Sequence, residues 1–135
     1  MTSAAALAAL LAATSARGEE PPPFRQGLWQ FDRTVGDQKI QTRECTNPTR
    51  ELQLQNTLLA RSGCTFTPTQ RSENTYTFSA GCTINTPGAA SVSAQSTSVM
   101  TVESESAYQV EITTTGAGTS TRETLIARRV GDCSK

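Results

Sequence analysis

The sequence contains no histidine, and this absence excludes more chemistry than any other feature of its composition. Serine–histidine and cysteine–histidine catalytic pairs cannot form without an imidazole ring, and neither can a histidine-ligated metal site. The commonest hydrolase designs are therefore excluded. We predict that the chain is not an enzyme and that it uses no cofactor and no metal ion.

Net charge and long apolar runs are missing as well. Twelve Lys and Arg residues balance twelve Asp and Glu residues, so no overall field draws the protein to nucleic acid or to an anionic membrane surface. No segment reaches the ~20 apolar residues that a membrane-spanning helix needs. We expect neither a nucleic-acid partner nor a membrane span.

Hydrophobic residues make up only 36% of the chain and charged residues 18%. Ser, Thr, Gln and Gly fill the balance, and this mixture favours strands and turns over long helices. A length of 135 residues suits one domain.

The first sixteen residues form an apolar run rich in Ala and Leu that ends in small side chains. Such a run is typical of a signal peptide over residues 1–16, with cleavage after Ala16. No Lys or Arg precedes the run, which departs from the usual pattern, and the alternative is an ordinary N-terminal helix or tail. We expect residues 17–23 to be a flexible leader, residues 24–135 to be one disulfide-braced domain, and the protein to be periplasmic or secreted.

Four cysteines, Cys45, Cys64, Cys82 and Cys133, lie behind this apolar run. An even number of cysteines in an exported chain favours two disulfides. A zinc site is disfavoured, because no two cysteines have the C-x-x-C spacing and no histidine could complete the ligand set.

Alternation of side chains predicts a hairpin at the start of the domain. Residues 27–35 place Trp29 and Phe31 on one face and polar residues on the other, which indicates a half-buried strand. Gly36 and Asp37 suit a two-residue turn with Gly first, and residues 38–45 return as a second strand.

A helix of about fourteen residues is predicted next. Asn47 can cap free amides, Pro48 suits the first turn, and Gly63 suits the position after the helix ends. Its expected apolar stripe consists of Leu52, Leu58 and Leu59, with Leu54 at the edge.

Residues 64–82 alternate most clearly. Even-numbered positions carry the apolar and cysteine side chains, and odd-numbered positions carry Thr and Ser. If the strands pair about Glu73, Phe66 faces Ala80 and Cys64 faces Cys82 at the separation that a disulfide needs. Pro68 interrupts the first strand, which suggests a sheet edge or a bulge.

Four cysteines allow three pairings. Cys45 and Cys64 flank the predicted helix and lie about 20 Å apart, so a bridge between them is disfavoured. The register favours Cys64–Cys82, and Cys45–Cys133 then follows by elimination.

Three further amphipathic strands are predicted around Val92–Val102, Tyr108–Thr113 and Leu125–Val130. The fold class is therefore mainly β (α+β). We expect an antiparallel meander sheet of about seven strands, curved or partly closed into a barrel, with one helix inserted after the second strand.

Candidate binding residues are few. Trp29, Phe31, Tyr76 and Phe78 fall on inward faces, where they can line a ligand cavity or simply fill the core. Glu103 and Glu105 are better explained as solvated charges in a turn than as a catalytic carboxylate pair.

Several landmarks together resemble a known bacterial family. They are the Gly-Leu-Trp start of the first strand at residues 27–29, Cys45 with Pro48, Cys64, Cys82, and the Gly-Asp-Cys of residues 131–133. Their order is similar to that in the family catalogued as domain of unknown function 3617, over about residues 24–134. The resemblance implies an exported envelope protein and supplies no catalytic residues. Arg128, Arg129 and Val130 stand where many members have aromatic residues.

The leading hypothesis is a non-enzymatic periplasmic protein that binds an apolar small molecule in the concavity of the sheet, or another envelope component. A purely structural or partner-binding module is the alternative, and an exposed apolar patch in place of a pocket would indicate it. A carboxylate-based hydrolase is a remote third possibility, which clustering of Asp32, Glu44 or Asp132 in a cleft would favour.

Overall fold

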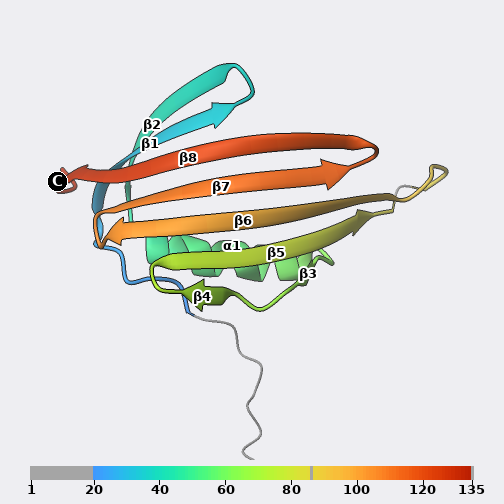
Figure 1. Cartoon of the computed structure of the whole chain (residues 1–135), viewed down its shortest axis with the longest axis horizontal. Coiled ribbons are helices and arrows are strands. Elements are labelled where there is room, and N and C mark those ends of the chain that lie inside the picture. The colour runs from blue at the N-terminus through green and yellow to red at the C-terminus, as the bar shows by residue number, and fades with distance from the viewer. Residues whose placement is uncertain (1–19, 86, 135) are drawn as a thin grey trace, which may run out of the picture.

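The computed structural model describes residues 20–85 and 87–134 of the chain. One curved antiparallel sheet forms the body of the protein, and a single helix lies behind it in the view of Figure 1. The signal-peptide prediction for residues 1–16 lies outside the described residues, as does the first part of the predicted leader. The elements are β1 (Gly27–Val35), β2 (Gln38–Thr46), α1 (Pro48–Arg61), β3 (Thr65–Phe66), β4 (Gln70–Ser72), β5 (Thr75–Ile84), β6 (Val92–Ser104), β7 (Ala107–Gly116) and β8 (Thr119–Gly131).

The sheet has eight strands in the order β2-β1-β8-β7-β6-β5-β3, with β4 also paired to β5, and it is not closed. Strands β5 to β8 form a meander. The β1–β2 hairpin adds to the β8 edge of that meander, so strands from the two ends of the described chain lie side by side (Figure 1). The predicted mainly-β class and the single helix after the second strand are confirmed.

Pro68 explains why there are eight strands instead of about seven. The predicted register places Phe66 opposite Ala80, and the structure has this pair. Beyond Pro68 the register slips by one residue, and Arg71 lies opposite Tyr76. The guanidinium of Arg71 then lies 5.3 Å from the centroid of the Tyr76 ring. The expected single strand is therefore split into β3 and β4, because proline cannot donate to the ladder.

Helix α1 begins and ends where the sequence predicts. The Asn47 side chain accepts a hydrogen bond from the Arg50 amide, Pro48 occupies the first turn, and Gly63 has a positive φ of 83° after the last turn. The apolar stripe is narrower than expected. Leu58 is 53% exposed and Leu54 is 59% exposed, whereas Leu52 packs against the core. The prediction that Leu58 belongs to the stripe facing the core is wrong. The helix contacts the core through Leu52, and Leu58 points away from it.

The concave face of the sheet carries the core at one end. Phe24, Trp29, Tyr108 and Ala127 are buried there, with Met100 and Val110 behind them. The Phe24 ring lies 4.6 Å from that of Tyr108 and 5.9 Å from that of Trp29, centroid to centroid. We call this the closed end of the concave face. At the opposite end, which we call the open end, the same strands present the small or polar side chains of Ala80, Ser96, Thr114 and Thr121 in one row across the sheet.

Two disulfides flank the helix. Cys45, at the end of β2, is joined to Cys133 beyond β8, and Cys64, just after α1, is joined to Cys82 in β5. These are the two pairings that the sequence favours. Helix α1 runs from the β2 edge of the sheet to the β3 edge, so it is fastened to the sheet near both of its ends (Figure 1).

Candidate functional site

A cavity of about 340 Å³ lies between α1 and the concave face, next to the core. Three neighbouring rows of paired residues form its floor. The first row consists of Phe78, Ser98, Ile112 and Glu123. The second row consists of Met100, Val110, Leu125 and Arg33. The third row includes Tyr108, Phe31 and Thr42. The volume is at the lower end of the range for small-molecule sites.

The cavity exists because one row contains a small residue and because the helix stands above it. Ser98 separates Phe78 from Ile112 in the ladder, and its short side chain leaves the space between those larger side chains unfilled. The roof is supplied by one face of α1, through Glu51, Leu52 and Gln55. Gln55 lines the cavity and is exposed, so the helix does not pack closely onto the floor at this position.

A second hollow of about 50 Å³ adjoins the first. The two share Leu52, Gln55, Phe78 and Met100 as lining residues, so they form one continuous groove under the helix. Pro22 closes its far side. The Pro22 carbonyl accepts a hydrogen bond of 2.6 Å from the Thr49 hydroxyl of α1, and that hydroxyl accepts one of 2.8 Å from the Phe24 amide. Pro22, which belongs to the predicted leader, is thus hydrogen-bonded to the helix.

The four residues that the sequence suggests as pocket lining are divided between the cavity and the core. Phe31 and Phe78 line the larger cavity, and Tyr76 lines the smaller one. Trp29 is fully buried instead, with 0% exposure, and lines neither. Its indole nitrogen donates a hydrogen bond of 2.9 Å to the Arg25 carbonyl, which satisfies the polar end of the ring within the protein.

Four carboxylate and guanidinium groups lie among the lining residues. Arg33 pairs with Glu123 across β1 and β8, at 3.0 Å. Glu51 accepts a hydrogen bond of 2.6 Å from the Thr46 hydroxyl, which holds its carboxylate at the first turn of α1. Glu44 lies on β2 at the rim. Burial raises the pKa of Tyr108 to about 12, and the negative charge of Glu51 adds to that shift.

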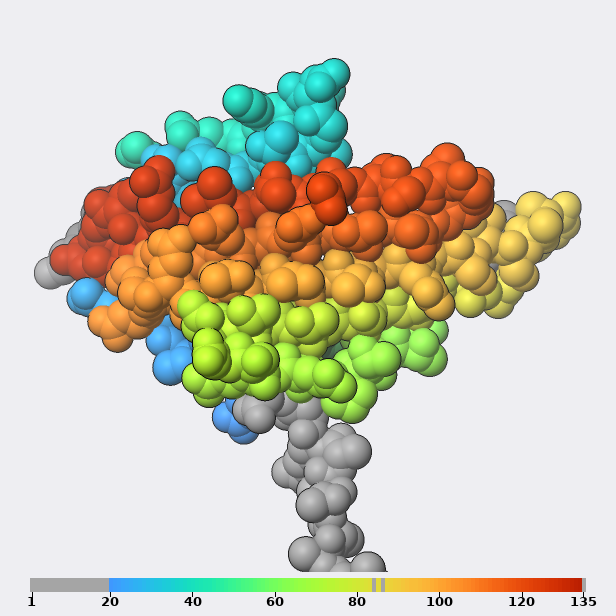
Figure 2. All heavy atoms as spheres, viewed as in Figure 1, coloured from blue at the N-terminus to red at the C-terminus, as the bar shows by residue number. Residues whose placement is uncertain are grey.

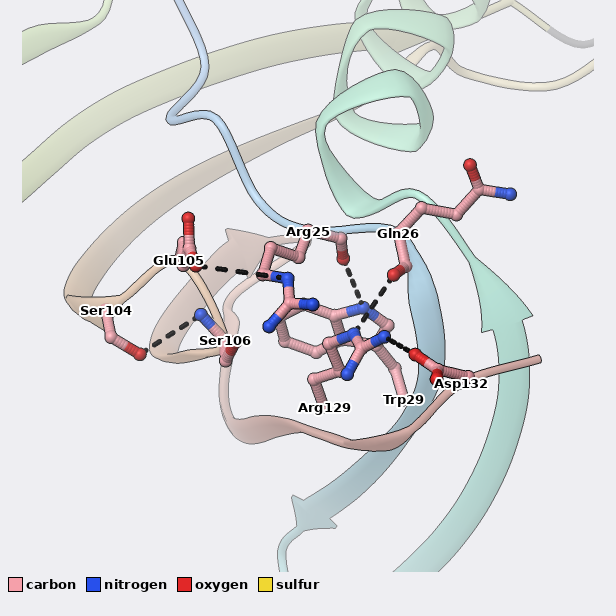
Figure 3. A network of polar contacts seen from close by, with 8 residues as sticks. All are labelled: Arg25, Gln26, Trp29, Ser104, Glu105, Ser106, Arg129 and Asp132. Carbon is pink, nitrogen blue, oxygen red and sulfur yellow. Dashed lines mark hydrogen bonds and ion pairs between the residues drawn. The ribbon is translucent and has the colours of Figure 1, made fainter.

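The closed end is sealed by a polar network that Figure 3 shows from close by. Arg129 donates a hydrogen bond of 3.0 Å to the Gln26 carbonyl and pairs with Asp132. Gly27 has to be glycine here, because a Cβ at this position would lie 2.7 Å from the Gly131 carbonyl and would overlap the Arg129 guanidinium. The Gly-Leu-Trp and Gly-Asp-Cys segments of the family resemblance therefore meet at one place, and they close the core.

The turn between β6 and β7 completes this seal. Arg25 pairs with Glu105 at 3.9 Å, and the Arg25 amide donates to the Glu105 carbonyl at 2.9 Å (Figure 3). Glu103, which neighbours it, accepts a hydrogen bond from Gln109. The two glutamates thus take part in separate contacts at the surface.

The convex face carries a different set of polar groups. Asp32 accepts hydrogen bonds from Gln41 at 2.8 Å and from Gln30 at 3.2 Å, and these bonds lower its pKa. Glu44 faces the cavity on the other side of the sheet, and Asp132 lies at the closed end. The three carboxylates proposed as a hydrolytic cluster are therefore on different parts of the protein.

Exposed apolar side chains are scattered. Val99 and Ile126 lie on the convex face, where Figure 2 shows β5 to β8 side by side. Val35 and Ile40 lie on the β1–β2 hairpin. Leu54 and Leu58, one turn apart, form the outer face of α1.

Sequence reasoning missed the roof and the polar groups of the cavity. The predicted contact face of the helix was based on its leucines and left out Glu51 and Gln55. These two residues are four positions apart, so they lie on one face of the helix. Arg33 and Glu123 are far apart in sequence, and only the pairing of β1 with β8 brings them together. Ser98 matches the inward parity of β6, and its small size was the available signal for a hollow.

Two kinds of feature are absent from residues 20–85 and 87–134. No group of three or more His, Cys, Asp and Glu side chains in these residues is arranged to hold a metal ion. No helix in the same part of the chain is long and apolar enough to span a membrane.

Comparison with known protein families matches residues 24–133, which is most of the chain, to the family described as "Protein of unknown function (DUF3617)". The matched residues include both disulfides, the whole sheet and α1. No curated protein and no solved structure matches the chain. The chain belongs to the DUF3617 family.

Proposed function

We propose that this protein is a non-enzymatic binding protein of the bacterial envelope, exported to the periplasm, that holds an apolar small molecule between α1 and the sheet. The observation that carries this proposal is the cavity of about 340 Å³ beside a well-packed core. Its floor exposes aromatic and aliphatic side chains, notably Phe31, Phe78 and Leu125. An apolar ligand that displaces water from these side chains gains the free energy of burying apolar surface.

The disulfides support both parts of the proposal. Disulfides persist in oxidising compartments such as the periplasm and are rare in the cytosol. Both bridges also lie next to the ends of α1, so they hold the roof of the cavity at a fixed height over its floor. A preformed cavity loses less conformational freedom on binding than a collapsed one would.

A direct test uses 1-octanol as a neutral apolar probe, measured by calorimetry on the oxidised protein. Ser98→Phe places a ring in the floor of the cavity and should weaken octanol binding about tenfold or more, since the ring takes the space of the ligand. Val99→Phe is the matched control, because Val99 is the next residue of β6 and lies on the convex face. Equal octanol affinity in both variants would refute the cavity as the binding site.

A second pair of variants tests the same site from the roof. Gln55→Trp fills the cavity from an exposed helix position, so folding is little affected, and Gln53→Trp changes an exposed position of the same helix outside the cavity lining. Only the first variant should weaken octanol binding. Loss of binding in both would instead indicate a general effect on the helix.

Export has its own test. The protein should be recovered from the periplasmic fraction without residues 1–16, and its mass should be lower by four hydrogen atoms than that of the same chain after reduction. Recovery of the uncleaved chain from the cytosol with four free thiols would contradict the proposed location.

A docking module for another envelope protein is the second candidate, and the exposed Leu54 and Leu58 on α1 favour it. In that case Leu54→Ser with Leu58→Ser would abolish binding to the partner while Ser98→Phe would not. The octanol experiment separates the two functions, since a docking module requires no affinity for the probe.

A further inference from the structure

The ionisable groups that line the cavity are unequal in sign. Arg33 is the one positively charged residue among them, and Glu44, Glu51 and Glu123 are negative, so the lining of the described cavity carries a net charge of −2 (+1 from one Arg, −3 from three Glu). Arg33 is already paired with Glu123 at 3.0 Å. Glu44 at the rim and Glu51 in the roof are therefore the charges that remain for a ligand.

Two buried hydroxyl groups also face the cavity. Tyr108 is 5% exposed and Ser98 is 6% exposed, and both line the space beneath α1. In residues 20–85 and 87–134, every side-chain nitrogen or oxygen atom that is sealed from solvent has a hydrogen-bond partner. A hydroxyl oxygen that faces the cavity can accept a hydrogen bond from a polar atom inside it.

Tyr108 and Glu51 form the most polar part of this lining. The Glu51 carboxylate is held in place by the Thr46 hydroxyl at 2.6 Å, and its charge acts on the phenol of Tyr108. The phenol stays protonated and neutral at ordinary pH, so its oxygen can accept a hydrogen bond. A carboxylate beside such an acceptor suits a donor that carries positive charge.

The apolar part of the site extends away from this polar end. Phe78, Met100 and Leu52 line both the larger cavity and the smaller hollow that continues it. An alkyl chain can lie along these side chains while its polar end remains near Glu51. Resting on the proposed binding function, we infer that the ligand is a cationic amphiphile, in which a protonated amine lies near Glu51 and Tyr108 and an apolar chain lies along the floor.

The test compares three probes with the same chain and different head groups. Octylammonium, 1-octanol and octanoate are cationic, neutral and anionic at pH 7. Calorimetry should give the tightest binding for octylammonium and the weakest for octanoate, with about a tenfold difference in Kd between these two. Raising the ionic strength should narrow the difference, because exposed charges are screened by salt.

Variants locate the preference. Glu51→Gln keeps an oxygen that can accept the Thr46 hydrogen bond but removes the charge, and it should bring the octylammonium Kd to within about twofold of the octanol Kd. Glu111→Gln is the matched control, because it removes the same charge from the convex face, where Glu111 pairs with Arg122 at 2.9 Å. Glu44→Gln gives a second, independent variant at the rim.

The outcomes separate this inference from the function on which it rests. Equal binding of the three probes, or tightest binding of octanoate, would overturn the cationic ligand and leave an apolar binding site. A cation preference that persists unchanged in both Glu51→Gln and Glu44→Gln would overturn it as well. Absence of binding by all three probes would overturn both the ligand class and the binding function.

Discussion

The two ends of the concave face are built from the same strands by the same alternation, yet they differ in what they can do. At the closed end the inward side chains are large, as in Trp29 and Tyr108, and they fill the space between the sheet and the chain that covers it. At the open end they are small or polar, as in Ser96 and Thr114. Alternation therefore decides which side chains point inward, whereas their size decides whether the interior becomes core or cavity. The buried core is concentrated at one end, and the cavity lies beside it, towards the region of smaller side chains.

Removing the disulfide at the closed end should have the largest effect. Cys45→Ser with Cys133→Ser opens a loop of 88 residues and should lower the free energy of unfolding by about 4.5 kcal/mol. Cys64→Ser with Cys82→Ser, nearer the open end, opens a loop of 18 residues and should cost about 3 kcal/mol. Urea denaturation of both variants measures the difference. A larger loss at Cys64–Cys82 would reverse the comparison.

Truncating a large inward side chain should show the same contrast. Trp29→Ala removes a side chain with 0% exposure and should cost about 4 kcal/mol, since the cavity that it leaves cannot collapse. Phe66→Ala, towards the open end, removes a side chain that is 37% exposed and should cost about 1 kcal/mol. Thermal or urea unfolding gives both values, and similar losses would show that the open end is packed as tightly as the closed end.

Glycine positions offer a finer test of how closely the closed end is packed. Gly27→Ala forces a methyl group against the Gly131 carbonyl and the Arg129 side chain, and should cost about 2 kcal/mol. Gly131→Ala is the control, because a Cβ there meets no atom within 4 Å and the backbone does not require glycine. We expect the control to change stability by less than about 0.5 kcal/mol. If both variants unfold at the same denaturant concentration, the closed end has room to adjust.

The smallest effect is a titration. Tyr108 has a pKa raised to about 12 by burial, so the folded state favours its neutral form. Its contribution to stability is complete below the unfolded pKa of about 10 and is lost as pH rises through 12. Ultraviolet absorbance should show one tyrosine that ionises near pH 12, and Tyr108→Phe should remove that step. If the ionisation step near pH 12 persists in the variant, it belongs to a residue other than Tyr108.

The sequence predicts the local parts of this fold because each has a local cause. Alternation about Glu73 places Cys64 beside Cys82, and the Asn47 cap with Pro48 sets the start of α1. The position of β1 beside β8 has no such signal, because no short-range pattern records which distant strand will be a neighbour. The cavity could not be predicted for the same reason, because its lining comes from strands that are distant in the sequence. Phe31 and Phe78 could be suggested from parity, but the pairing of Arg33 with Glu123 and the distance of Gln55 from the floor depend on assembly of the whole sheet.

The place of β1 next to β8 also determines the order in which the molecule can be assembled. During synthesis the β1–β2 hairpin emerges first, but its neighbour in the sheet is the last strand of the described chain. Cys64 and Cys82, which are 18 residues apart, can meet before Cys133 has been synthesised, whereas Cys45 can reach its native partner only afterwards. Cys45 and Cys133 are 88 residues apart, so we expect the long bridge to close after the short one, because contacts between distant segments form slowly.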